Sequence, residues 1–271
     1  MKNILAKLSV PMVLVAVGFF DKHNLYESSY SRAGYVIILT LLVNFLYENY
    51  NKLGFFFLTK MLYREKEIRL SISYLFRIQV ENEYLLVKSR TRNYFQPVGG
   101  CYKTLPGSEK IYEKLEVRPD RKFETEKGIA KNDLRVYVKG KNVIEFFKWY
   151  DSKEDRETSP WREFCEELLT TKILPGWDFR YIDYKFKKTI KTPIIDLNMK
   201  GKGMFVYDVF DLVINNEQLP ILKKLKENSS EDYIWVTDEI IQSLGHDAGA
   251  KGFKYEIAPH TKYAQNLKWS K

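Results

Sequence analysis

The first sixty or so residues differ in character from the rest of the chain, and this contrast limits the possible folds more than any other feature. From Ile4 to Leu62 the sequence is rich in Leu, Val, Ile and Phe, whereas charged residues are spread throughout from Tyr63 onward. A chain of 271 residues suits one ordinary domain with an appendage, or two small domains. We therefore expect an apolar part over residues 1–64 and a domain over residues 65–271.

Two stretches of the apolar part are long enough to cross a membrane. Residues 4–20 are apolar apart from Lys7 and Ser9, and a helix of this length spans roughly 25 Å. Residues 33–50 contain GYVIILTLLVNFLY, with tyrosines at both ends as in an interfacial belt. The polar segment Asp21–Arg32 between them predicts a short loop. The pattern predicts a transmembrane hairpin of two helices.

Basic residues flank this hairpin unequally. The loop between the two stretches holds Lys22 and Arg32, whereas more Lys and Arg residues precede the first stretch and follow the second. The positive-inside rule then places both termini in the cytoplasm. Two alternatives stay open: a cleaved signal peptide ending near Ala16-Val17-Gly18, or two core helices of a soluble protein.

Composition narrows the chemistry of the domain. A formal net charge of +9 favours anionic partners such as phosphates or acidic lipid headgroups. Two cysteines, Cys101 and Cys165, do not make a disulfide framework. The three histidines are scattered, so neither a zinc-binding spacing nor a Cys-His nucleophile pattern is present.

Short β-rich runs dominate the domain and surround one clear helix. The helix is predicted over Trp161–Leu169, in the sequence WREFCEELL. Strands on either side of a helix indicate a mixed α/β domain. The predicted strands are SISYLFRIQV, YLLVKSR, VYVKG near Val136, VIEFF near Val143, DFRYIDYKFKKTI around Arg180 and GMFVYDVFDLVI.

Three carboxylates make this helix the most informative part of the sequence. Glu163, Glu166 and Glu167 stand at positions i, i+3 and i+4, which share one face of an α-helix. Carboxylates on adjacent turns repel one another unless a positive charge lies between them. Mg²⁺ is suited to this position, because it takes oxygen ligands and bridges to substrate phosphates.

The sequence around this helix resembles the Nudix family. Arg162, Glu163, Phe164, Glu166 and Glu167 occupy positions of the Nudix box, and seven residues separate Glu154 from Arg162. Gln96-Pro97-Val98-Gly99-Gly100 resembles the strand end that precedes the box. The resemblance implies a Nudix-type mixed sheet with a Nudix helix. It also implies that Gly99, Gly100 and Arg162 bind the ligand, while Glu163, Glu166 and Glu167 hold Mg²⁺.

The box also departs from the family pattern. Lys148 and Leu169 replace two of its glycines, and an insertion at about 101–153 separates Gly-Gly from the box. These departures put catalytic turnover in doubt and make a nucleotide sensor the preferred interpretation over an active hydrolase.

The combination of a two-helix anchor with the QPVGG and WREFCEEL strings is similar to the SMODS-associated Nudix proteins of bacterial anti-phage (CBASS) signalling. That resemblance implies an inner-membrane effector that senses a cyclic oligonucleotide made by a partner CD-NTase. Its helices would then assemble as a homo-oligomer to breach the lipid bilayer and cause abortive infection, and no DNA partner is expected. The alternative is a membrane-tethered, Mg²⁺-dependent hydrolase of nucleoside diphosphate derivatives.

Overall fold

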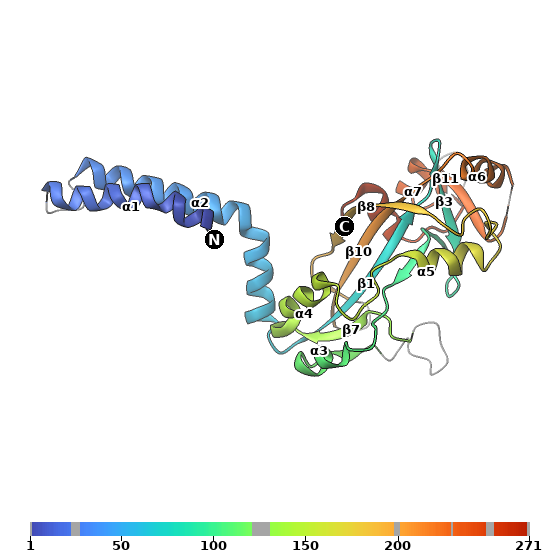
Figure 1. Ribbon diagram of the computed structural model, residues 1–271, viewed down its shortest axis with the longest axis horizontal. Coiled ribbons are helices and arrows are strands. Elements are labelled where there is room, and N and C mark those ends of the chain that lie inside the picture. The colour runs from blue at the N-terminus through green and yellow to red at the C-terminus, as the bar shows by residue number, and fades with distance from the viewer. Residues whose placement is uncertain are drawn as a thin grey trace. The chain divides into compact units, whose positions relative to one another are not determined.

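The computed structural model describes residues 2–22, 28–120, 131–197, 201–228, 230–247 and 252–269. The chain divides into two compact units, residues 1–62 and 63–271 (Figure 1). Each unit is described by itself below.

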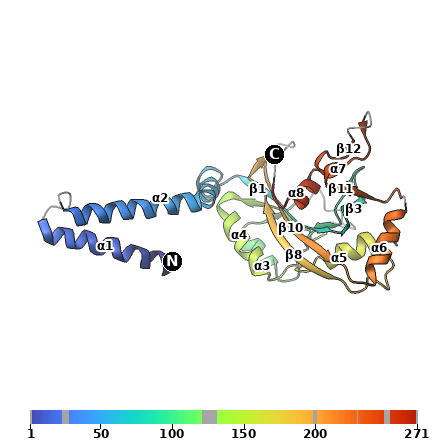
Figure 2. The same ribbon diagram turned by 90° about the horizontal axis from the view of Figure 1, so that it is seen from above.

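The first unit is a pair of long helices that pack side by side (Figures 1 and 2). Helix α1 spans Lys2–Lys22. Helix α2 spans Ser29–Phe57 and continues as a π-helical turn, η1, over Leu58–Leu62. The second helix thus begins four residues before the predicted start at residue 33, inside the segment predicted to be a loop. Residues 23–27 of that predicted loop lie outside the described residues.

Glycines bring the two helix backbones close together. A Cβ atom added to Gly18 would lie 2.0 Å from Ser31 Oγ, and one added to Gly34 would lie 2.7 Å from Val15 Cγ2 and 2.8 Å from the carbonyl oxygen of Pro11. Small residues at helix contacts are what allows such an approach. The hairpin therefore depends on these two positions having no side chain.

Apolar side chains cover the outside of this unit. Val10, Phe20, Val36 and Tyr47 are each more than 60% exposed. The continuous helix Ser29–Leu62 is long and apolar enough to cross a membrane, and the apolar stretch Val10–Phe20 beside it is shorter. One candidate span is therefore present in the described residues, and crossing by both helices stays a prediction.

The second unit is built on a mixed β-sheet. Its strand order is β6-β7-β1-β10-β8, with β5 paired to β1 and β9 paired to β10. Strands β1 and β10 run parallel, and the other pairs are antiparallel. The strands are β1 (Glu67–Arg77), β5 (Gly99–Cys101), β6 (Arg118–Pro119), β7 (Arg135–Lys139), β8 (Asp183–Lys191), β9 (Ile195–Asp196) and β10 (Lys202–Val213).

Smaller sheets and short helices complete the unit, which confirms the predicted mixed α/β class. A second sheet has the order β11-β3-β2 with β4 paired to β3, and β12 pairs with β13. These strands are β2 (Gln79–Val80), β3 (Glu83–Lys88), β4 (Phe95–Gln96), β11 (Tyr233–Thr237), β12 (His246–Asp247) and β13 (Gly252–Phe253). The helices are α3 (Glu109–Lys114), α4 (Gly140–Ser152), α5 (Trp161–Phe164) with the π-helical turn η2 (Cys165–Leu169), α6 (Gln218–Glu227), α7 (Asp238–Gln242) and α8 (His260–Asn266).

Strand β1 lies at the centre of the core. Its alternate side chains Ile68, Leu70, Ile72, Tyr74 and Phe76 point to one face and are fully buried. On the opposite face, Leu75 belongs to a cluster with Ile190, Val209 and Ala264 of α8. Polar residues alternate with these apolar ones as far as Ser73, whereas Tyr74, Leu75 and Phe76 are buried on both faces of the strand.

The predicted strand VIEFF near Val143 is wrong, because these residues belong to helix α4. Val143, Phe146, Phe147 and Tyr150 are all buried. Their spacing of three, four and seven residues is that of one helix face. A short run of apolar residues satisfies strand and helix patterns alike, and only the longer spacing separates the two. The segment 101–153 thus contributes β7 to the main sheet and α4 beside it.

Candidate functional site

The predicted helix that resembles a Nudix helix, called the Nudix helix below, is present, but it is not a regular α-helix. It begins at Trp161 as α5 and continues through Leu169 as the π-helical turn η2. Phe164 and Leu168 are fully buried, and the Phe164 ring lies 5.6 Å from that of Phe76 on β1. This confirms the predicted helix. A π-helical turn contains an extra residue, so it rotates the following side chains relative to α-helical spacing.

Arg162 lies at the centre of a cluster of carboxylates. Its Nη1 donates to Glu163 at 2.6 Å and to Glu166 at 3.2 Å, and its Nε donates to Glu157 at 3.1 Å. Its Nη2 donates to the Cys101 carbonyl at 2.8 Å. The planar guanidinium can serve several acceptors at once, because its donors are fixed in a fork. The helix therefore compensates its own acidic residues with its own arginine.

The Gly99-Gly100 pair lies directly against the glutamates of the helix. The Gly99 N–H donates to Glu167 Oε2 at 2.8 Å. A Cβ atom on Gly100 would lie 2.2 Å from Glu163 Oε1. Gly99 also has φ +151, and its own Cβ would lie 2.1 Å from the Tyr74 carbonyl oxygen. The structure thus brings together the six residues predicted for this site, Gly99, Gly100, Arg162, Glu163, Glu166 and Glu167.

Burial changes the protonation of two of these carboxylates. Desolvation raises the pKa of Glu167 to about 8, although the Gly99 N–H acts in the opposite direction. Desolvation also raises the pKa of Glu163, against the lowering effect of Arg162. Glu166 is more exposed than either. Glu167 therefore holds a proton through much of the neutral range.

The carboxylates in this arrangement do not fit a divalent cation. Arg162 lies against both Glu163 and Glu166, while Glu167 is turned to the Gly99 N–H. Within the described part of the chain, no group of three or more His, Cys, Asp or Glu side chains could hold a metal ion. Binding of Mg²⁺ stays a prediction that requires Arg162 to leave its partners.

Three residues of the cluster were missed by the sequence reasoning. Glu157, and not the exposed Glu154, bonds to Arg162. Arg90 lies 3.5 Å from a carboxylate oxygen of Glu166 and donates to its carbonyl. Tyr74 accepts the Glu163 N–H at 3.3 Å. Arg90 and Tyr74 are far from the helix in sequence, so no local spacing could reveal them.

A second, buried cluster connects the site to helix α4. The carboxylate of Asp208 on β10 accepts hydrogen bonds from Tyr102 at 2.9 Å, Tyr150 at 2.8 Å and Thr189 at 2.5 Å. The Arg156 guanidinium lies 3.9 Å from the centre of the Tyr150 ring. These bonds hold α4 to the sheet and to the segment that precedes the Nudix helix.

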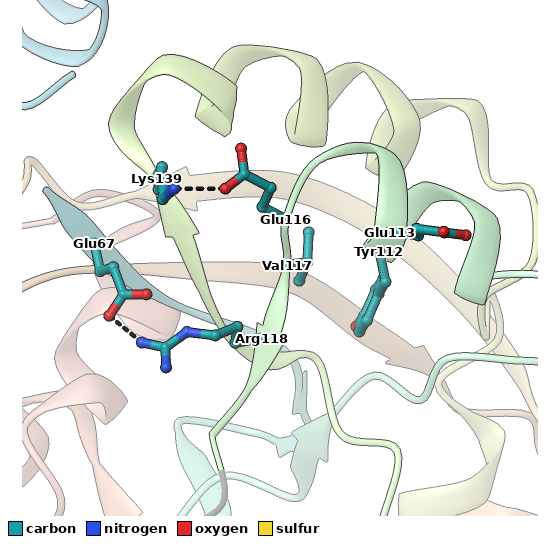
Figure 3. A pocket seen from close by; sticks show the side chains of 7 residues that line it. All are labelled: Glu67, Tyr112, Glu113, Glu116, Val117, Arg118 and Lys139. Carbon is teal, nitrogen blue, oxygen red and sulfur yellow. Dashed lines mark hydrogen bonds and ion pairs between the residues drawn. The ribbon is translucent and has the colours of Figure 1, made fainter. Parts of the chain in front are cut away.

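An open cavity of about 380 Å³ lies near the start of β1 (Figure 3). Tyr112 and Val117 line it together with two ion pairs, Glu67–Arg118 and Glu116–Lys139. Each cation at this cavity already has a carboxylate partner in the figure, so the cavity presents mixed charge and no dominant anion-binding group.

The comparison with protein families identifies this domain. The family model of the SMODS-associated NUDIX domain matches residues 67–265, which is most of the chain. No curated protein matches the chain. Nudix domains generally use divalent metal ions, and SMODS association points to the effectors of CBASS systems. From the family match and the Nudix helix against Gly99-Gly100, we conclude that the chain belongs to the SMODS-associated Nudix family.

Proposed function

We propose that this protein is a membrane-anchored effector whose Nudix domain senses a cyclic oligonucleotide made by a partner synthase. On binding, the N-terminal helices assemble as a homo-oligomer and disrupt the inner membrane, which kills the infected cell. The observation that carries the proposal is the joining of a SMODS-associated Nudix domain to a helical pair whose outer surface is apolar.

The carboxylate cluster supports sensing over hydrolysis. A Nudix hydrolase needs its glutamates to bind a metal that polarises phosphoryl oxygens. Here Arg162 is bonded to Glu157, Glu163 and Glu166, and burial keeps Glu167 protonated near neutral pH. Arg162 has the charge and the planar donors that recognise phosphates, so an incoming phosphate would compete with these glutamates for it.

The membrane step follows from association of several hairpins. One pair of helices cannot enclose a pore, whereas several can. Ligand-driven association of the soluble domains would raise the local concentration of the helices in the bilayer. Both termini then lie in the cytoplasm, where the ligand is made.

The test uses the full chain reconstituted into dye-filled liposomes. A panel of cyclic oligonucleotides is added, with linear dinucleotides and Mg²⁺ in parallel samples, and both dye release and the recovered nucleotide are measured. A sensor releases dye with one cyclic member, and that nucleotide is recovered intact. The variant Arg162→Ala loses the response.

The hydrolase alternative predicts a different result in the same samples. The observation in its favour is that the box retains Glu163, Glu166 and Glu167, with Glu163 and Glu167 next to Gly99-Gly100. Cleaved monophosphates without dye release, abolished in the double variant Glu166→Gln, Glu167→Gln, would make the protein an enzyme and would end the sensor proposal.

A further inference from the structure

An aromatic and basic surface lies along the free edge of the main sheet. Strand β8 ends the path of the described sheet and pairs only with β10 there. Trp177 is 75% exposed, Tyr181 79% and Phe186 52%, although large aromatic side chains are usually covered. We call this surface the aromatic edge; it consists of Trp177, Arg180, Tyr181, Tyr184, Lys185, Phe186 and Lys188.

Buried neighbours hold the exposed rings in place. Phe179, between Trp177 and Tyr181, is fully buried, and its ring lies 6.4 Å from that of Phe164 on the Nudix helix. The Gln218 side chain donates to the carbonyl of Tyr181 at 3.1 Å. The buried Phe179 and the hydrogen bond from Gln218 therefore hold the backbone of this segment in place. Trp177 and Tyr181 are exposed on a backbone of fixed position.

Lysines alternate with aromatic residues on β8. Phe186 and Tyr184 pack by their edges against Phe210 on one face of the sheet. Lys185 and Lys188 are paired in register with Asp211 and Val209, on the opposite face. Successive side chains of a strand point to opposite faces of the sheet. If β8 lies along a flat surface, the rings of Tyr184 and Phe186 therefore meet it on one side of the strand, and the ammonium groups of the lysines meet it on the other.

We propose that the aromatic edge docks the Nudix domain onto an anionic lipid surface. Trp and Tyr rings prefer the membrane–water interface, because one end is apolar and the other forms hydrogen bonds. Lysines near such a surface are attracted to phosphate headgroups, each by about a factor of five in association. This inference requires the helices to hold the domain at a membrane, but it does not depend on which nucleotide the domain binds.

Two other occupants fit the geometry less well. A nucleobase would need the face of an aromatic ring, but the guanidinium of Arg180 lies 3.9 Å from the centre of the Trp177 ring and covers one of its faces. A second copy paired through β8 would bring Lys185, Lys187 and Lys188 against the same lysines. Like charges across strands are destabilising, and edge lysines oppose such pairing.

The experiment uses the full chain in nanodiscs with and without anionic lipid, made with brominated lipids that quench nearby tryptophan. All five tryptophans lie in residues 63–271, so their fluorescence reports on the domain and not on the helices. The difference between the wild-type chain and Trp177→Phe isolates the signal of Trp177. We expect this signal to be lost in brominated anionic nanodiscs and kept in brominated neutral ones.

Charge variants test the cause of the quenching. The double variant Lys185→Glu, Lys188→Glu should restore the Trp177 signal, whereas Lys223→Glu, Lys224→Glu on the exposed face of α6 is the matched control and should leave the quenching unchanged. Lys223 lies 3.6 Å from Glu81, so the control alters an ion pair outside the aromatic edge.

Other outcomes overturn the proposal. A Trp177 signal that is equally bright in all nanodiscs excludes lipid docking. A signal that changes only when two chains share a nanodisc assigns the edge to a second copy, and one that changes only with added oligonucleotide assigns it to nucleic acid. Failure of the chain to enter nanodiscs at all would instead contradict the membrane anchor, and is seen separately by co-purification.

Discussion

Among the carboxylates of the Nudix helix, Glu167 is the one whose pKa is raised furthest by burial. Its pKa rises from an ordinary value of 4.5 to about 8 on folding. Between these values the folded domain holds a proton that the unfolded chain has released. Its contribution to stability is therefore complete at low pH and is lost as the pH rises through about 8.

We expect Glu167→Gln to flatten this pH dependence. The amide keeps an acceptor for the Gly99 N–H but has no proton to lose. The variant should be more stable than the wild-type chain above pH 8, by a few kcal/mol on the order expected for such a shift, with little difference near pH 4. Urea unfolding across this range, without divalent cations, measures it. Glu227→Gln at an exposed carboxylate is the control, and equal slopes for all three chains would contradict the assignment.

The next prediction concerns Arg162, whose positive charge is shared by several carboxylates. In Arg162→Ala, Glu157, Glu163 and Glu166 lose their shared cation, so we expect the domain to lose about 2 to 4 kcal/mol of stability. Mg²⁺ should then restore part of this loss, since the released carboxylates could ligate it. Thermal unfolding with and without Mg²⁺ measures both effects. If Mg²⁺ stabilises the wild-type chain and the variant equally, Arg162 does not exclude the cation.

At the scale of elements, the two glycine contacts set the distance between α1 and α2. In Gly18→Leu the new side chain would meet the side chain and backbone of Ser31. Because close helix contacts need small residues, we expect the two helices to move apart by several ångströms. Spin labels at the exposed Val13 and Val36, in a chain without its native cysteines, measure the separation. Gly54→Leu is the matched control, because nothing lies within 4 Å of a Cβ at Gly54. An unchanged distance in Gly18→Leu would show that the helices do not meet there.

Helix α4 is held by Asp208, a buried carboxylate with three hydroxyl donors. In Asp208→Asn one acceptor oxygen is replaced by an N–H₂ group that faces donors, so we predict a loss of about 2 to 4 kcal/mol of domain stability. Tyr150→Phe removes one of the three donors and should cost less, about 1 kcal/mol. Chemical unfolding measures both. Equal effects of the two changes would show that the carboxylate itself is not the centre of this cluster.

The sequence predicted elements better than it predicted their contacts. The Nudix helix over Trp161–Leu169 and the long strand β10 could be read from apolar spacing. The bond from Gly99 to Glu167 spans 68 positions, and that from Arg90 to Glu166 spans 76. Such pairs depend on how the sheet and the helix pack, which local periodicity does not contain. The π-helical turn was not predicted either, because no residue type in it distinguishes it from an α-helical turn.

At the scale of the whole molecule, the division into two units predicts independent folding of the domain. The larger unit begins at Tyr63 and contains the main sheet, the elements that cover its two faces, and Arg162 with its carboxylate partners. We expect a fragment of residues 63–271 to unfold in one cooperative transition, at the same temperature as the domain in the detergent-solubilised full chain. Calorimetry compares the two. A fragment that aggregates or melts much earlier would show that the helices are part of the domain's stability.

Helix α4 is fastened at both of its ends. At its beginning, the N–H groups of Gly140 and Lys141 donate to the carbonyls of Lys66 and Arg64, each at 2.9 Å. Near its end, Arg156 donates to the carbonyl of Tyr150 at 2.7 Å and to that of Glu157, whose carboxylate bonds to Arg162. The chain leaves the helical pair through residues 64–66.

Helix α4 therefore ties the first residues of the domain to the segment that precedes the Nudix helix. The bonds of Tyr150 to Arg156 and Asp208 do not involve Arg162, so they would keep this end of α4 in place even if a phosphate drew Arg162 away from Glu157. The first residues of the domain would thus stay in position when the site is occupied.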